Sequence, residues 1–210
     1  MSRATDGVRP SDARVLPDGT DQRMSDLVAR AIELLRLARV RLDPGLSDAE
    51  VSAVQERFGF EFGPEHRELI QSVLPAGSDV WPDWRHGSPG DLQGRLDRPA
   101  DGVLFDVHRN AFWPATWGPR PDARDEREAC ARDRLVGVPR LIPLYSHRYL
   151  AAGRAYHPSP VLSVCQTDVI HFGNDLVDYL AHEFGVADRQ PSPARVRVPF
   201  WSDLADGVEL

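Results

Sequence analysis

Residues 141–185 read LIPLYSHRYLAAGRAYHPSPVLSVCQTDVIHFGNDLVDYLAHEFG, and this stretch decides the fold class. It contains short apolar segments bounded by polar and turn-forming residues, a pattern that predicts β-strands. The expected strands are Leu141–Tyr145, Arg148–Ala151, Val161–Gln166 and Asp168–Phe172. A helix is expected to begin at Asn174 and Asp175, to bury an apolar stripe, and to end at Gly185.

Upstream of these strands, the sequence predicts helices. One is expected after Ser25, a second opens with the capping box Ser47-Asp-Ala-Glu50 and ends at Gly59, and a third begins at Pro64. In the third helix we expect His66 to be half-buried and hydrogen-bonded. Helices before the strands and one helix after them predict an α+β domain with a central, mainly antiparallel sheet, rather than alternating βαβ units.

The middle of the chain predicts mostly loop. Residues 75–90 carry turn-forming residues, Val103–Val107 has the composition of a strand, and the stretch that continues to Pro121 suggests an aromatic loop or edge hairpin. Residues 122–136 are charged and alanine-rich and are expected to be helical. In this interpretation, 1–23 is a disordered tail and 24–204 a single domain, with 185–195 a polar linker, Phe200 and Trp201 folded back, and 205–210 a tail.

Composition narrows the possible functions. A net charge of −7 and a pI near 5.5 argue against general nucleic-acid binding, which requires a basic face. No apolar run approaches the roughly 20 residues of a membrane span. Residues 1–23 lack the apolar core of a secretion signal, and Cys130 and Cys165 match no metal or redox spacing. We therefore expect a cytoplasmic protein with no nucleic-acid or membrane partner.

Four of the five tryptophans lie between Trp81 and Trp117 in proline-interrupted segments without helical periodicity. Large rings in irregular backbone are either packed or exposed to a partner, and tryptophan and arginine dominate interface hot spots. The segment Asp83-Trp-Arg85 could therefore cap a core edge, with the arginine stacked on the indole and paired with the carboxylate, or contact a partner directly. We expect Trp84 to be mainly structural and Trp81 mainly exposed.

Residues 43–74 carry seven carboxylates against two arginines, a formal charge of −5. Such a segment is either a solvated helix face or a surface that attracts a basic partner, since complementary charge raises association rates.

No complete catalytic or metal-binding signature is present. Asp106 and His108 on one face of an expected strand could join Asp168 and His171 in a metal site, but this signal is weak. Cys165 is expected to be buried in mid-strand, and Ser146-His147 lacks the turn of a serine nucleophile. No phosphate-binding loop occurs. We expect no cofactor, no metal and no catalytic residue.

The segments Gly45–Val51, Glu56–Phe60 and Pro64–Ile70 resemble the opening helix pair of the SUKH superfamily, which includes the yeast Smi/Knr cell-wall-assembly regulators and bacterial immunity proteins. Further segments resemble a bacterial branch of that superfamily and extend the match over roughly residues 43–204: Trp81–Arg85, Gly102–Asp106, Phe112–Pro121, Val138–Pro143, His147–Leu150, Pro160–Val164, Gln166–Ile170, His182–Gly185 and Phe200–Leu204. The resemblance implies a SUKH-like α+β fold used as a binding scaffold without established catalytic residues. It also implies that His66 and His171 replace packing aromatics.

The leading hypothesis is a non-catalytic protein-binding module, an immunity protein that neutralises a basic bacterial toxin domain by occlusion, as the resemblance implies. The residues expected to contact the partner are Trp81, Asp83, Trp84, Arg85, Trp113 and Trp117 as an aromatic patch, with Glu50, Glu61 and Glu65 contributing charge. The alternative is a Smi/Knr-like regulatory or scaffolding protein that acts on endogenous partners, tethered by its tail and a basic helix with Arg30, Arg36, Arg39 and Arg41. A third hypothesis is a metal-dependent hydrolase.

Overall fold

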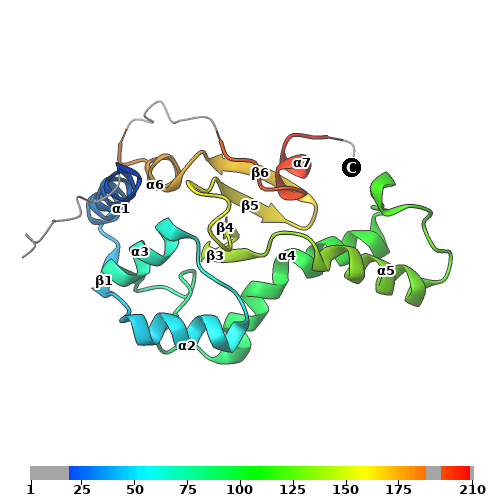
Figure 1. Ribbon diagram of the computed structural model, residues 1–210, viewed down its shortest axis with the longest axis horizontal. Coiled ribbons are helices and arrows are strands. Elements are labelled where there is room, and N and C mark those ends of the chain that lie inside the picture. Colours follow the sequence, from blue (N-terminus) through cyan, green and yellow to red (C-terminus); the bar gives the residue numbers. More distant parts are fainter. Residues whose placement is uncertain (1–18, 188–194, 209–210) are drawn as a thin grey trace, which may run out of the picture.

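The computed structural model describes residues 19–187 and 195–208 and shows an α+β fold (Figure 1). The N-terminal part contains α1 (Gly19–Leu37), β1 (Arg41–Pro44), α2 (Asp48–Phe58), α3 (Pro64–Ser72) and β2 (Val73–Ala76). The middle contains α4 (Pro89–Arg109), the short 3-10 helix η1 (Ala115–Trp117) and α5 (Arg124–Val136). The C-terminal part contains β3 (Leu141–Tyr145), β4 (Arg148–Ala151), β5 (Val161–Cys165), β6 (Asp168–Gly173), α6 (Leu176–Phe184) and α7 (Trp201–Ala205).

The expected antiparallel sheet is confirmed. Strands β3 to β6 pair in sequence order, with Ile142 opposite Leu150, Tyr149 opposite Leu162 and Val164 opposite Val169. Each pairing is antiparallel, and each strand lies within one residue of the bounds expected from the apolar segments. The short apolar segments bounded by turn-forming residues therefore located these strands correctly, and β3, β4 and β5 are buried along almost their whole length.

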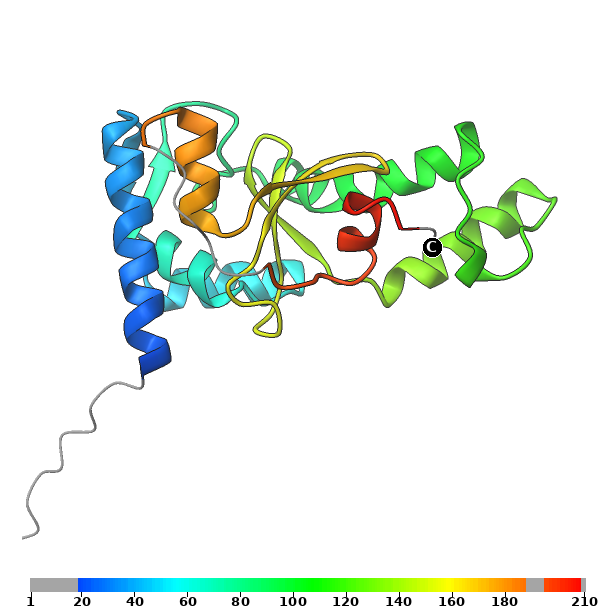
Figure 2. The ribbon, with the colours of Figure 1, turned by 90° about the horizontal axis from the view of Figure 1, so that it is seen from above.

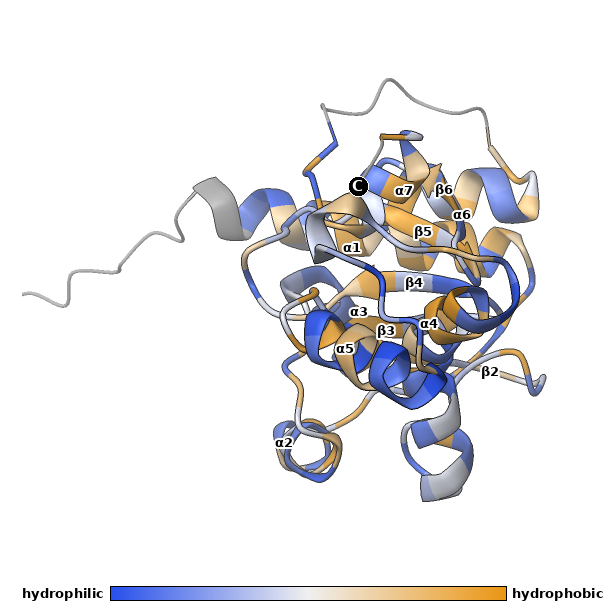
Figure 3. Ribbon diagram, turned by 90° about the vertical axis from the view of Figure 1, so that its right-hand side faces the viewer, coloured by the Kyte–Doolittle hydropathy of each residue, from blue (hydrophilic) through white to orange (hydrophobic). Residues whose placement is uncertain are grey.

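Helices cover both faces of this sheet. On one face, Tyr149, Leu162 and Val164 join a core with α4, α7 and the aromatic segment after α4. On the other face, Leu150 and Val161 join a core with α1, α3 and α6. A third core lies between α2, α3 and the start of α4. Figures 1 and 2 show the far end of α4 and α5 extending beyond the sheet, and Figure 3 shows α5 to be mostly hydrophilic.

Local signals placed the ends of two helices correctly. At α2, the Ser47 hydroxyl accepts the Glu50 amide, the Glu50 carboxylate accepts the Ser47 amide, and Gly59 ends the helix in the left-handed conformation. At α6, the Asp175 side chain accepts the Asp178 amide and Gly185 is again left-handed. Both ends satisfy backbone groups that a helix leaves unpaired, as the residue types predicted.

The strand expected at Val103–Val107 is wrong, because these residues belong to the long helix α4. The helix begins after the N-cap Ser88 and continues through Pro99. Its buried residues are Leu92, Leu96, Pro99, Val103, Leu104, Asp106 and Val107, which recur at helical spacing. Five apolar-rich residues judged alone resembled a strand, whereas the period over 21 residues is helical.

The N-terminal bounds also need correction. Helix α1 already begins at Gly19, so the expected tail 1–23 overlaps its first turn, and 1–18 lie outside the described residues. The pair β1–β2 was not expected. Helix α3 ends at Ser72, because the next four residues pair with 41–44 as β2. Four-residue strands carry too little periodicity to be recognised without their partners.

The C-terminal segment folds back as expected, with Phe200 and Trp201 buried beside β6 and the α4 core. Most of the expected polar linker, 188–194, lies outside the described residues, and the expected tail 205–210 begins inside α7. Within 19–187 and 195–208, no helix combines the length and apolarity that crossing a membrane requires.

Candidate partner-binding site

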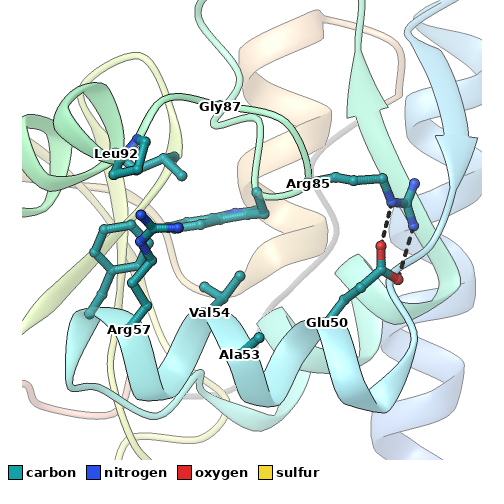
Figure 4. A pocket seen from close by; sticks show the side chains of 10 residues that line it. Glu50, Ala53, Val54, Arg57, Arg85, Gly87 and Leu92 are labelled. Carbon is teal, nitrogen blue, oxygen red and sulfur yellow. Dashed lines mark hydrogen bonds and ion pairs between the residues drawn. The ribbon is translucent and has the colours of Figure 1, made fainter.

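Three of the residues expected to contact a partner line one pocket, which we call the α2 slot (Figure 4). It has a volume of about 180 Å³ and lies between α2 and the loop 81–88. Its lining residues are Glu50, Ala53, Val54, Arg57, Phe58, Trp84, Arg85, Gly87, Pro89 and Leu92. Val54, Phe58, Trp84 and Leu92 are buried and apolar, whereas charged side chains stand at both ends.

Arg85 fixes one end of the α2 slot. Its Nε donates to Glu50 Oε1 at 2.7 Å, and its two terminal nitrogens donate to the carbonyls of Pro44 and Gly45 at 2.9 and 2.7 Å. The pKa of Glu50 is lowered to about 2, mainly by the hydrogen bond from Arg85 and then by those from the Ser47 amide and hydroxyl. One guanidinium therefore ties the loop, the end of β1 and the first turn of α2 together.

The expected pairing of Arg85 with Asp83 is wrong. The Asp83 Oδ1 instead accepts the backbone amides of Arg85 and His86 at 3.2 and 2.8 Å. This is the local turn that aspartate favours, and it orients the loop at Arg85. The Arg85 guanidinium pairs instead with the carboxylate of Glu50, 35 residues earlier in the chain.

The tryptophans of the loop 81–88 pack in opposite directions. Trp84 is 5% exposed and meets the ring of Phe62 edge-on, with centroids 5.3 Å apart, as expected for a structural residue. Trp81 was expected to be exposed, but it is only 7% exposed and packs against Tyr145 and Phe184 at 4.6 and 6.3 Å. Trp81 is therefore a core residue between the sheet and α6, where its apolar area is removed from water.

Trp113 and Trp117 do not join a patch with the loop 81–88. Trp117 is buried and stacks on Phe200 at 6.3 Å, and Trp113 meets Trp117 edge-on at 5.3 Å. The half-buried Trp113 donates its Nε1–H to the Gly118 carbonyl at 2.8 Å. These rings hold the segment after α4 against α7, so the six expected residues do not form a single aromatic surface.

The acidic segment 43–74 is largely neutralised within the chain. Ion pairs join Asp43 to Arg41, Asp48 to Arg67, Glu50 to Arg85, Glu61 to Arg154 and Glu65 to His157. Among the described residues, no ion pair is present for Glu56 or Glu68. Because Arg41, Arg85 and Arg154 come from outside the segment, the steering field expected from its charge of −5 is weaker than the sequence indicated.

Glu61 and Glu65 have a structural role that the sequence did not indicate. Glu65 is only 1% exposed, lies 2.6 Å from His157 Nδ1 and accepts the Ser159 amide. Glu61 accepts Arg154 Nε at 2.8 Å, and its carbonyl accepts the Gly153 amide. Both carboxylates thus hold the connection between β4 and β5, and Glu65 is too buried to contact a partner.

His66 is also more buried than expected. It is 1% exposed, its Nδ1 has no hydrogen-bond partner, and its ring meets Phe62 edge-on at 5.0 Å. Burial lowers its pKa to about 3, because the charged imidazolium would lose its hydration. The expectation of a half-buried, hydrogen-bonded histidine is therefore wrong at Nδ1.

The substitution His66→Phe is expected to reduce acid sensitivity. Below pH 6.5 the unfolded chain protonates this histidine while the folded chain does not until about pH 3, so stability falls with pH across that window. We expect wild type to lose about 2 kcal/mol more than His66→Phe between pH 7 and pH 5, measured by urea unfolding. Parallel losses in the two proteins would refute the assignment.

The residues considered for metal or nucleophilic chemistry serve other contacts. The Asp106 carboxylate accepts hydrogen bonds from the amide and hydroxyl of Thr167 and from the side-chain amide of Asn110. His108 Nε2 lies 3.0 Å from Glu128 Oε2. His171 lies 3.2 Å from Asp206 without a hydrogen-bond alignment. No group of three potential metal ligands occurs in 19–187 and 195–208. Asp106 and His108 lie two residues apart on a helix, so they point in different directions rather than sharing a strand face.

The sequence prediction missed Arg57 as a residue of the α2 slot. Its signal is the spacing of Glu50, Ala53 and Arg57, which places all three on one face of a helix. Cys165 was expected to be buried, but it is exposed at the end of β5. Its exposure depends on where the strand meets its turn, which no local pattern indicates.

Comparisons with protein-family models, with curated proteins and with solved structures find no match for this chain.

Proposed function

We propose that this chain is a non-catalytic protein-binding module, an immunity protein that neutralises a bacterial toxin by occluding it. The resemblance to the SUKH superfamily suggests this class of function. The observation that carries the proposal is the α2 slot, where an apolar floor lies between a fixed Glu50–Arg85 pair and Arg57. Preorganised pockets lined by tryptophan and arginine are typical of interface hot spots.

The size of the α2 slot favours a partner side chain over a small-molecule ligand. Its volume is about 180 Å³, whereas sites for drug-sized ligands measure roughly 300–1,000 Å³. Arg57 has no ion pair among the described residues, and its guanidinium carbon lies 5.9 Å from the Phe58 ring centroid. It is therefore available to an acceptor on the partner, while the floor takes an apolar or aromatic anchor.

The charge of the partner is a separate matter. Because five carboxylates of segment 43–74 are already paired inside the chain, they do not require a basic partner. The proposed occlusion rests on the shape and anchors of the α2 slot, with α2 and the loop 81–88 as the contact surface.

The substitution Ala53→Arg is expected to abolish partner binding without unfolding the protein. Ala53 is exposed on α2 at the rim of the slot, so a long side chain there obstructs entry while the core stays intact. We expect the affinity to fall by about 2 kcal/mol or more, in the hot-spot range, with an unchanged melting temperature. Titration of the partner captured from the native host measures the affinity.

The matched control is Ala129→Arg, the same change at an exposed position of α5. It should bind as wild type does. Equal affinity of the two variants would exclude the α2 slot as the contact surface. Capture of a single toxin domain, encoded beside this gene, supports immunity, whereas several housekeeping partners would support the scaffolding alternative.

A further inference from the structure

The largest of the hollows described lies on α4, away from the α2 slot, and we call it the α4 groove. Its volume is about 590 Å³, within the roughly 300–1,000 Å³ of small-molecule sites. One wall is a single face of α4, with Gly94, Arg98, Asp101, Gly102 and Phe105. The other wall comes from the ends of strands, with His147, Val164, Cys165 and Gln166.

The α4 groove contains an unpaired cation. Arg98 is exposed and has no ion pair or hydrogen bond among the described residues. Arg95, one turn earlier, is instead held by Asp91 at 2.8 Å and by the carbonyls of Asp79 and Val80. Asp101 is the carboxylate in the lining and has no ion pair with Arg98. Arg98 is thus free to bind a negative group.

His147 adds a neutral donor beside Arg98. Burial lowers its pKa, and the charges of Arg148 and Arg98 lower it further against the opposing effect of Glu183. Its Nδ1 lies 3.1 Å from Ser146 Oγ, which leaves Nε2 for a ligand. A cationic field that disfavours imidazolium favours an anion in the same place.

The rest of the lining consists of two glycines, the apolar Phe105 and Val164, and Cys165 and Gln166. Phe105 is 47% exposed at the rim, and Val164 is buried in the wall. Beneath α4, Tyr149 is fully buried, and its hydroxyl has no partner in the described residues. Burial raises the pKa of Tyr149, whereas the positive charges of Arg98 and Arg95 lower it. This hydroxyl therefore also lies in the electrostatic field of the two arginines.

Gly94 lines the α4 groove from within a helix. A glycine inside a helix costs about 1 kcal/mol relative to alanine. A Cβ on Gly102 would lie 2.8 Å from the Gln166 Cα, so packing explains that glycine. A Cβ on Gly94 would meet nothing within 4 Å, so packing does not explain this one.

We propose that the α4 groove binds a small organic anion with an apolar body. Arg98 and the His147 imidazole hold the negative group, and Phe105 and Val164 contact the apolar body. Gly94 leaves the space that the body occupies. This site is separate from the α2 slot and does not depend on partner binding there.

The test uses two probes that differ mainly in charge, the anion 1-anilinonaphthalene-8-sulfonate and its neutral analogue N-phenyl-1-naphthylamine. Fluorescence titration of the folded protein should show one site for the anion. Arg98→Gln should lower the affinity for the anion about tenfold, because one charge-assisted hydrogen bond is lost. It should change the affinity for the neutral probe less than about twofold. Arg109→Gln, an exposed arginine on the same helix outside the groove, should change neither.

Two further measurements locate the probe. The anion should slow alkylation of Cys165, which lines the groove, by N-ethylmaleimide, and should leave Cys130 on α5 unaffected. Gly94→Ala should raise the melting temperature, because alanine favours a helix more than glycine does. It should also lower the affinity for both probes, because its methyl group enters the groove. The proposal is overturned if Arg98→Gln behaves as Arg109→Gln does, if Cys165 is not protected, or if Gly94→Ala leaves both affinities unchanged.

Discussion

Trp81→Ala is expected to lower the free energy of unfolding by about 3–5 kcal/mol, the range for emptying a large aromatic site in a core. The indole is 7% exposed and packs against Tyr145 of β3 and Phe184 of α6. Removing it leaves a cavity where the loop 81–88, the sheet and α6 meet. The side chains around this cavity belong to three separate elements, so we expect them to relax into it only partially. Urea unfolding followed by circular dichroism measures the loss.

Trp113→Ala is the matched control, since this half-buried indole lies in the segment between α4 and η1. It should lose clearly less stability than Trp81→Ala, because less of its ring is removed from water. A Trp81→Ala protein that unfolds at the wild-type urea concentration would contradict the burial of this side chain. It would instead support the sequence-based prediction that Trp81 is exposed.

Glu65→Ala is expected to cost about 3–5 kcal/mol, as is typical when one partner of a buried ion pair is removed. The carboxylate is 1% exposed and holds both His157 and the Ser159 amide, so its loss leaves the buried Ser159 amide and the half-buried His157 without this acceptor. Glu61→Ala is the control, because the exposed pair Glu61–Arg154 on the same connection should contribute at most about 1 kcal/mol. Similar losses in both variants would disprove the anchoring role of Glu65.

The effect of Glu65→Ala should depend on pH in a definite direction. The hydrogen bond to Glu65 raises the pKa of His157, and the charges of Glu65 and Glu68 act in the same direction against desolvation. The stabilisation from that protonation is fully present below pH 6.5 and is lost as pH rises through the folded-state pKa. The stability difference between wild type and Glu65→Ala should therefore shrink above neutral pH.

Much of the fold follows from local patterns. The four strands of residues 141–173 were predictable because turn-forming residues bound short apolar segments. The closing helix was predictable because Asp175 and Gly185 bound an apolar stripe. The capping box at Ser47 and Glu50 likewise satisfies helix ends with neighbouring side chains. These features depend on contacts within a few residues, so the sequence contains their whole explanation.

The remaining features depend on distant segments. The strands β1 and β2 exist only as partners of one another, although about 30 residues separate them. The site shows the same division, since Arg85 binds a glutamate 35 residues earlier and Glu65 holds a histidine 92 residues later.

By itself, the sequence determined the α+β class, the strand segments and the helix caps. Only the tertiary structure decided that Trp81 is buried, that most acids of segment 43–74 are paired within the chain, and that Glu50, Trp84 and Arg85 line one slot. The physical reason is that burial and ion pairing are set by which segments fold together, whereas helix caps and strand alternation are set by neighbours along the chain.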